Sequence, residues 1–383
     1  RDCGDIFAER AGLSIYSSDS KSVTLPLATI SEPYQNPDPP KFIVGQVSLP
    51  DVVGSYDYIF WSDALMLIKP DSTLLTIWLA TLSSLTLIRE PVRDGFSTAL
   101  ARVRKTGWIF LNPHTFLRVA TAIRFSETRP IVQAAPRLIF KYLGAYISTA
   151  LSRKERASVL IEHYTFLRGR VVGGFFRKVV DSRLELWQHD ADEHTYRISL
   201  SFPRTTHDEG DLALIFEADR EDLYTLSFSI GPGSISGGFD GPTLYISRVQ
   251  GRAKGLPLIT KASKDCCDVS PARILLAAAE GVATALEIRH MVGIGASSQL
   301  SADKQHQSDL VRAYDEFWLA AGGLRLDRDI FHLAVPTALK PIQTIRRDHR
   351  RRALRKRHFR QLVTEQVCRA CRDHALVSGS DDV

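Results

Sequence analysis

Apolar residues recur every three or four positions between Gly95 and Val180, which is the period of an α-helix with one buried face. The sets are Phe96, Leu100 and Val103; Phe116, Val119 and Ile123; and Leu138, Phe140, Leu143 and Ile147. Ser152 and Glu155 have the spacing of a capping box, because each side chain can bind a free amide of the first helical turn. We therefore predict a helical N-terminal part in which one helix begins at Ser152.

At about Leu184 the period changes to an alternation of apolar and polar residues, which is typical of β-strands. Polar or glycine-rich turns separate five such runs: LELWQ, TYRISLSFP, DLALIFEA, LYTLSFSIG and TLYISRVQG. Because short turns join neighbouring runs, the simplest arrangement is an antiparallel meander.

Helices and strands alternate after the meander. Ser270 and Pro271 suit the cap and first turn of a helix that continues through an Ala/Leu-rich segment. A short strand ending near Gly295, a polar helix closed by glycines 322–323 and a last strand, FHLAVP, follow. The order of helices, meander, helix, strand, helix and strand predicts an α/β or α+β fold.

We divide the chain into four parts: residues 1–65, a helical region over 66–183, an α/β core over 184–340, and a basic helix with a tail over 341–383. Scattered prolines and a lack of periodicity predict that residues 1–65 are poorly structured. Met66 is the first methionine, so we expect it as an alternative translation start with residues 1–65 upstream. The apolar segment Ser72–Ile88 is short of the roughly 20 residues that span a membrane, and we favour a buried helix.

The positive charge of the chain is concentrated in one segment. The formal net charge is +6, whereas residues 346–360 alone carry nine cations and one carboxylate, so the remainder is slightly acidic. The cations are Arg346, Arg347, Arg350, Arg351, Arg352, Arg355, Lys356, Arg357 and Arg360. We predict a helix whose docking stripe consists of Ala353, Leu354, Phe359, Leu362 and Val363.

This basic helix suits an anionic membrane surface or another phosphate-bearing ligand, because Coulomb attraction favours phosphate. The alternative is an acid-paired helix packed against the domain. Nucleic acid is less favoured as a partner, since Phe359 is the only aromatic ring in the segment that could stack on bases.

The cysteines indicate neither a disulfide framework nor a metal site. Five of them at irregular spacing are too few to cross-link 383 residues, which favours a reducing cytoplasm. Cys266 and Cys267 are adjacent and suit a tetrahedral site poorly, while Cys368 and Cys371 lack a second pair of ligands. We therefore predict no metal.

Several motifs, taken together and in order, resemble the VirK/YbjX-type family of bacterial proteins, whose biochemical activity is undefined. They are HYTFL, LYTLSFSIG, YISRVQG, LITKASKDCCDVSPARILL, IRHMVGIGASSQ, YDEFW and the basic tail. The resemblance extends roughly from Arg102 to Arg369. It implies a role in envelope integrity, surface-protein display or virulence, and it brings no catalytic residue. We expect a cytoplasmic protein, either free or peripheral to the inner membrane.

The core also resembles the fold of the GCN5-related acetyltransferases. In that fold a strand ends in Gln/Arg-x-x-Gly-x-Gly/Ala, and the N-terminus of the next helix holds the cofactor pyrophosphate. Gln250, Ala253 and Gly255 fit this spacing loosely after YISRVQG. The candidate cofactor-binding residues are Gln250, Gly251 and Gly255. The next helix is predicted only from Pro271, about fifteen residues later, which weakens the case for acyl-coenzyme A.

Two further side chains are candidates for catalysis. Tyr314 falls where such enzymes often keep a general-acid tyrosine, and the alternative is a packed aromatic ring. Glu280 lies in an apolar helix and needs a partner if it is buried; we expect Arg248 or Lys261.

Three functions stay open: a VirK-like protein without assigned catalysis, an acyl-coenzyme A-dependent acyltransferase, and a nonspecific nucleic-acid binder. If the strands ending at Gln250 and Gly295 are parallel neighbours that splay apart near the Pro271 helix, the second function is favoured. A closed hydrogen-bond ladder at that place would exclude it.

Overall fold

The computed structural model describes residues 104–105, 107–203, 207–252, 255–300, 311–339 and 341–377. All of these lie within one compact unit, Trp61–Val383. The expectations for residues 1–65 and for the apolar segment Ser72–Ile88 fall outside the described residues. Among the residues that are described, no helix is both long and apolar enough to cross a membrane.

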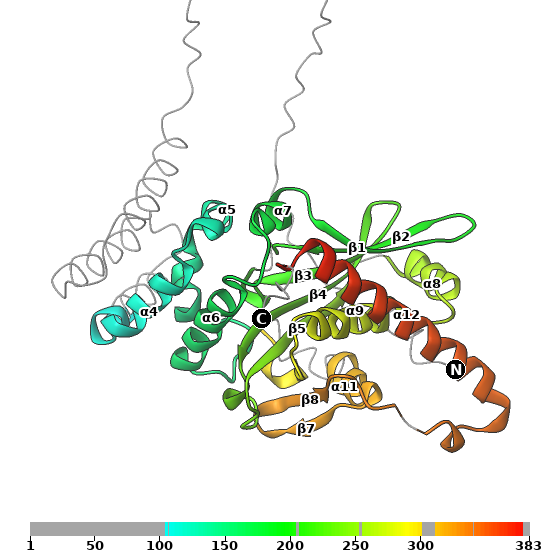
Figure 1. Cartoon of the computed structure of the whole chain (residues 1–383). Helices are drawn as coiled ribbons and strands as arrows, with labels where there is room; N and C mark the ends of the chain where they lie inside the picture. Colours follow the sequence, from blue (N-terminus) through cyan, green and yellow to red (C-terminus); the bar gives the residue numbers. More distant parts are fainter. Residues whose placement is uncertain are drawn as a thin grey trace, which may run out of the picture. The chain divides into compact units, whose positions relative to one another are not determined.

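One mixed sheet forms the centre of the described chain (Figure 1). Its eight strands stand in the order β1-β2-β3-β4-β5-β6-β8-β7. They are β1 Leu184–Asp190, β2 Thr195–Ser201, β3 Leu212–Ala218, β4 Glu221–Pro232, β5 Pro242–Gly251, β6 His290–Ile294, β7 Leu324–Leu326 and β8 Ile330–Ala334. The first five strands form the predicted antiparallel meander. β5 and β6 are parallel, and every other neighbouring pair is antiparallel.

The helices of the N-terminal part are α4 Pro113–Ile123, α5 Arg129–Ala134, α6 Arg153–Leu167 and α7 Phe175–Asp181. The predicted capping box at the start of α6 is confirmed: Ser152 Oγ accepts a hydrogen bond from the amide of Glu155, and the Glu155 carboxylate accepts one from the amide of Ser152. α6 packs against β4. The amphipathic α-helix predicted from Leu138 is wrong, because Pro136–Leu143 is a 3-10 helix, η2, that ends at the extended Gly144.

The later helices are α8 Leu256–Asp265, α9 Pro271–Ala285, the π-helical turn η7 Val311–Asp315, α11 Glu316–Ala321 and α12 Arg350–His374. α9 packs against the sheet on one side and against α12 on the other (Figure 1). Gly281 permits the close contact with α12, since a Cβ there would lie 2.6 Å from the carbonyl oxygen of Thr364. The prediction that the helix following Gln250–Gly255 begins only at Pro271 is wrong: α8 begins directly after Gly255.

A buried group of polar side chains joins the N-terminal part to the sheet. Lys141 Nζ lies 2.7 Å from Asp211 Oδ1 and donates to the carbonyl oxygen of Gly210 at 2.9 Å. The second carboxylate oxygen of Asp211 accepts hydrogen bonds from Tyr146 and from Ser229. Lys141 comes from η2 and Ser229 from β4, so one carboxylate links segments that lie far apart in the chain.

Neighbouring groups keep the buried carboxyl group of Asp211 ionised. Burial by itself raises the pKa of this carboxyl, but Lys141, His163 and the hydrogen bond from Ser229 outweigh burial and lower the pKa to about 2. Burial lowers the pKa of His163 to about 4, so this ring is neutral near pH 7. Burial also raises the pKa of Tyr146 well above its ordinary value. The group therefore holds one ion pair among neutral hydrogen-bond donors.

Replacing Lys141 by methionine should lower the free energy of unfolding by about 3–5 kcal/mol, because Asp211 would become an unpaired buried charge. Urea denaturation at neutral pH measures this loss. The double variant Lys141→Met, Asp211→Asn should recover part of it, since no charge is then buried. Equal stability of the single variant and the unmodified protein would contradict the structural role of the pair.

Candidate functional site

β5 and β6 are paired over four residues, after which β6 ends and β5 continues. Thr243–Ile246 of β5 lie beside His290–Gly293 of β6. Beyond Ile246, β5 continues to Gly251 in register with β4, whereas β6 ends at Ile294. The two strands are thus parallel neighbours, and the ladder between them is not closed along the second half of β5.

Two side chains donate hydrogen bonds to the last backbone carbonyl group of β6. The carbonyl oxygen of Ile294 accepts hydrogen bonds from Trp318 Nε1 at 3.0 Å and from Gln299 Nε2 at 2.8 Å. The amide of Gly295 donates to the carbonyl oxygen of Asp329, directly before β8, at 2.7 Å. Trp318 lies so close to Gly293 that a Cβ at this position would be 2.2 Å from the indole ring. The local sequence therefore ends β6 early.

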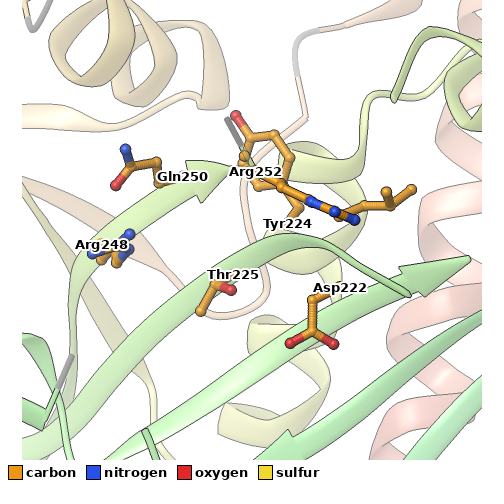
Figure 2. A pocket seen from close by; sticks show the side chains of 8 residues that line it. Asp222, Tyr224, Thr225, Arg248, Gln250 and Arg252 are labelled. Atoms are coloured by element: carbon orange, nitrogen blue, oxygen red, sulfur yellow. The ribbon is translucent and has the colours of Figure 1, made fainter. Parts of the chain in front are cut away.

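A pocket of about 230 Å³ lies where β5 passes the start of β4. Its lining residues are Asp222, Leu223, Tyr224, Thr225, Arg248, Gln250, Gly251 and Arg252. Figure 2 shows the labelled side chains on two neighbouring strands, with Arg248 and Gln250 on one and Thr225 on the next. We call this space the β4–β5 pocket. Its volume is below the roughly 300 Å³ at which sites for whole small molecules begin, so it suits one chemical group of a larger ligand.

The predicted cofactor-binding stretch borders this pocket. Gln250 and Gly251 line it, and Gly255 is the N-cap residue of α8. No side chain caps the first amides of α8. A Cβ on Gly251 would lie 2.7 Å from the ring of Tyr224 and 3.2 Å from Ile259, so only glycine allows α8 to start this close to the strand. Free amides at a helix N-terminus attract anions.

Tyr314 lies at the same end of β5. It is 5% exposed. Burial raises the pKa of its hydroxyl to about 12, while Arg248 and a backbone hydrogen bond with Val249 act in the opposite direction. The hydroxyl therefore lies against the part of β5 that β6 leaves uncovered, and it keeps its proton near neutral pH. Both interpretations of this residue, the packed ring and the proton donor, are compatible with that position.

An ion pair that the sequence did not indicate completes this region. Arg248 pairs with Glu209, which precedes β3 in the 3-10 turn η3, His207–Glu209. Within the residues that the structure describes, Arg248 Nε is buried and has no hydrogen-bond partner, and the same holds for the hydroxyl of Ser227, the residue beside Arg248 in the ladder. Two donors without partners are thus adjacent to the β4–β5 pocket. Glu209 and Arg248 are separated by 39 positions in the sequence, so no local sequence pattern could predict this contact.

Glu280 has a different partner from either of those expected. Its carboxylate accepts hydrogen bonds from the amide and the hydroxyl of Thr337, at 2.9 and 2.8 Å. Arg248 pairs with Glu209, and Lys261 pairs with Asp265 and Glu193. Glu280 therefore links α9 to the segment after β8 through hydrogen bonds. It is not among the residues that line the β4–β5 pocket.

The basic segment forms the 3-10 turn Arg347–His349 and the start of α12. Asp268 accepts hydrogen bonds from Arg352 and Arg355, at 3.1 and 3.0 Å. Arg350 donates to the backbone carbonyls of Gln343 and Ile345. The acid-paired packing expected as the alternative therefore accounts for part of the segment.

The predicted docking stripe of this helix is wrong at two positions. Leu354 is 52% exposed and Leu362 is 38% exposed, although both were expected to face the domain. α12 instead packs through residues that recur every four positions: Phe359, Val363, Val367 and Cys371. The strict four-residue spacing sets the buried face, and it turns both leucines outward.

No group of three or more His, Cys, Asp or Glu side chains within the described ranges is placed to hold a metal ion.

Comparison with known proteins places the chain in a family. A family model described as a protein of unknown function, DUF535, matches residues 95–369, which is more than half of the chain. The chain belongs to this family. DUF535 is the VirK family, so the resemblance predicted from the motifs between Arg102 and Arg369 is confirmed. No curated protein matches the chain, and no solved structure does.

In this VirK-family chain, Gly293→Ala should lower the free energy of unfolding by about 1–3 kcal/mol, because the new methyl group would overlap the buried Trp318. Thermal denaturation followed by tryptophan fluorescence measures the effect. Gly173→Ala is the matched control, since nothing lies within 4 Å of a Cβ there. Equal stability of both variants would show that Trp318 does not hold the end of β6.

Proposed function

We propose that this VirK-family chain is an acyltransferase that uses acyl-coenzyme A. The observation that carries the proposal is that β5 continues beyond the end of its parallel neighbour β6 and leads into the N-terminus of α8. The order of β2 to β8, with one parallel pair and a final antiparallel hairpin, also resembles the core of the GCN5-related acetyltransferases. α8 removes the objection that the sequence raised, because it begins directly after the Gln250–Gly255 stretch.

The residues around the β4–β5 pocket fit the phosphate end of coenzyme A. Gln250 presents an exposed amide, and Arg252 is a cation at the rim whose exposed pair with Glu221 is 2.8 Å long. The uncapped amides of α8 lie next to them. An exposed ion pair contributes little stability, so Arg252 can exchange its carboxylate for a phosphate at small cost.

Acyl-coenzyme A would supply the thioester that is cleaved. An amine or hydroxyl of the acceptor attacks the thioester carbonyl, a new bond to the acyl carbon forms, and the carbon–sulfur bond breaks. The departing thiolate takes up one proton, and the acceptor loses one. Tyr314 is suited to donate the proton to sulfur, because its hydroxyl is neutral near pH 7 and lies at the uncovered part of β5.

We further propose that this reaction serves the envelope role that the VirK resemblance implies, in a protein peripheral to the inner membrane. The role rests on the resemblance of the motifs to the VirK family, whose matching model describes a protein of unknown function. The basic segment 346–360 supports attachment to an anionic surface.

Coenzyme A at a hundred times its dissociation constant should stabilise the chain by about 2.7 kcal/mol. A thermal-shift titration measures the response. Gln250→Ala should reduce the shift, because the exposed amide would no longer contact phosphate, whereas Gln188→Ala on the exposed face of β1 should leave it unchanged. The absence of any shift at saturating coenzyme A would refute the proposed function.

Tyr314→Phe should lower kcat for thiol release from acyl-coenzyme A by about 10²- to 10⁴-fold, with binding of coenzyme A retained. The assay follows thiol release in the presence of a panel of amine and hydroxyl acceptors. Tyr196→Phe is the control: it also removes a hydroxyl, here one that donates to Asp265, from a strand remote in the sheet order. An undiminished kcat in Tyr314→Phe would leave this residue as a packed ring.

A further inference from the structure

The two sides of α12 differ in their surroundings. One side is buried, and the ring of Phe359 meets Trp187 and His189 of β1 with centroids 6.1 and 5.5 Å apart. The other side is exposed and carries Leu354 and Leu362. Leucine on a water-facing helix side is ordinary when it stands alone, so its neighbours decide what this side can bind.

Basic residues lie beside these two leucines, and Glu365 is the acidic neighbour of Leu362 on the same side. At 100° per residue, Arg351, Arg355 and His358 fall on the same side of the helix as Leu354 and Leu362, and all five are exposed. We call these five residues the basic face. The leucines stand eight residues apart, which is about 12 Å along the axis. The face thus presents two apolar side chains with Arg355 between them.

The charge of this region is only partly neutralised. Asp348 is the single acidic residue between positions 346 and 360, against nine cations. Asp268, from the turn before α9, pairs with both Arg352 and Arg355, so two cations share one carboxylate. The segment therefore keeps a positive charge that favours a polyanionic surface.

We infer that the basic face docks on an anionic lipid surface. Interfacial helices combine cations, which attract acidic headgroups, with apolar side chains that enter the boundary between headgroups and acyl chains. Leu354 and Leu362 supply the apolar part. A nucleic acid would make use of the cations but not of the leucines, and Phe359, the only aromatic ring in the helix, is 8% exposed and turned inward.

This inference does not depend on acyl transfer. The β4–β5 pocket is lined by β4 and β5, whereas the basic face belongs to α12. Binding to lipid and binding to coenzyme A can therefore be measured separately on the same variants.

The test is sedimentation of the full chain with vesicles of phosphatidylcholine, with and without phosphatidylglycerol. The chain should bind the anionic vesicles, and high salt should release it. The double variant Leu354→Ser, Leu362→Ser should bind about tenfold more weakly. Its control, Leu324→Ser with Leu339→Ser, removes two leucines of similar exposure outside α12 and should bind normally.

A second pair of variants tests the charge. Arg347→Gln with Arg351→Gln should weaken binding to anionic vesicles, while Arg118→Gln with Arg177→Gln, which changes the net charge equally at exposed positions, should not. Each variant is first shown to keep its thermal shift with coenzyme A, which excludes unfolding and separates this result from the proposed function.

Three outcomes would overturn the inference. The first is unchanged vesicle binding in the leucine variant, and the second is equal binding to neutral and anionic vesicles. The third is binding to polyuridylate without binding to vesicles, which would assign the basic segment to nucleic acid. If coenzyme A gives no shift even with the unmodified chain, circular dichroism replaces the folding control and the vesicle result still stands alone.

Discussion

The pair of Lys141 and Asp211 is the contact on which the arrangement of this fold depends. Two buried charges are stable only when each has its partner and the remaining hydrogen bonds are made, so the pair admits one geometry. Asp211 follows Gly210, where a Cβ would lie 2.7 Å from the amide nitrogen of Phe228 in β4. Glu209, the partner of Arg248, comes directly before. The buried pair thus sets the path of the chain into the candidate site.

The elements with strong local patterns were predictable, and those without them were not. Alternation of apolar residues predicted all five strands of the meander, and the Ser152 capping box predicted the start of α6. α8 was missed although Leu258, Ile259 and Ala262 have helical spacing, because Gly255 and Pro257 at its start are also typical of a turn. Its place is fixed by the packing of Ile259 close to Gly251 at the end of β5. β7 has only three residues, too few to show a period.

The candidate site was predictable only in pieces. Gln250, Gly251 and Gly255 are neighbours in sequence, so a motif could point to them. Glu209 and Arg248 meet across 39 residues, and Glu280 meets Thr337 across 57. Charge complementarity within one sequence allows many such pairs, and only the fold selects among them. This is why the partners expected for Glu280 were wrong although the need for a partner was real.

β5 continues beyond its last pair with β6, so part of its backbone edge is open to pairing with a ligand. Backbone groups along the edge of an inner strand need hydrogen-bond partners, and β6 provides them only as far as Ile246. Trp318 and Gln299 satisfy the end of β6, which leaves the edge of β5 to other groups, among them Tyr314 at Val249. A ligand that carries amides on a flexible arm could pair with such an edge as an added strand does. The arm of coenzyme A has this chemistry, and the basic face of α12, for which we propose lipid binding by charge and two leucines, does not require it.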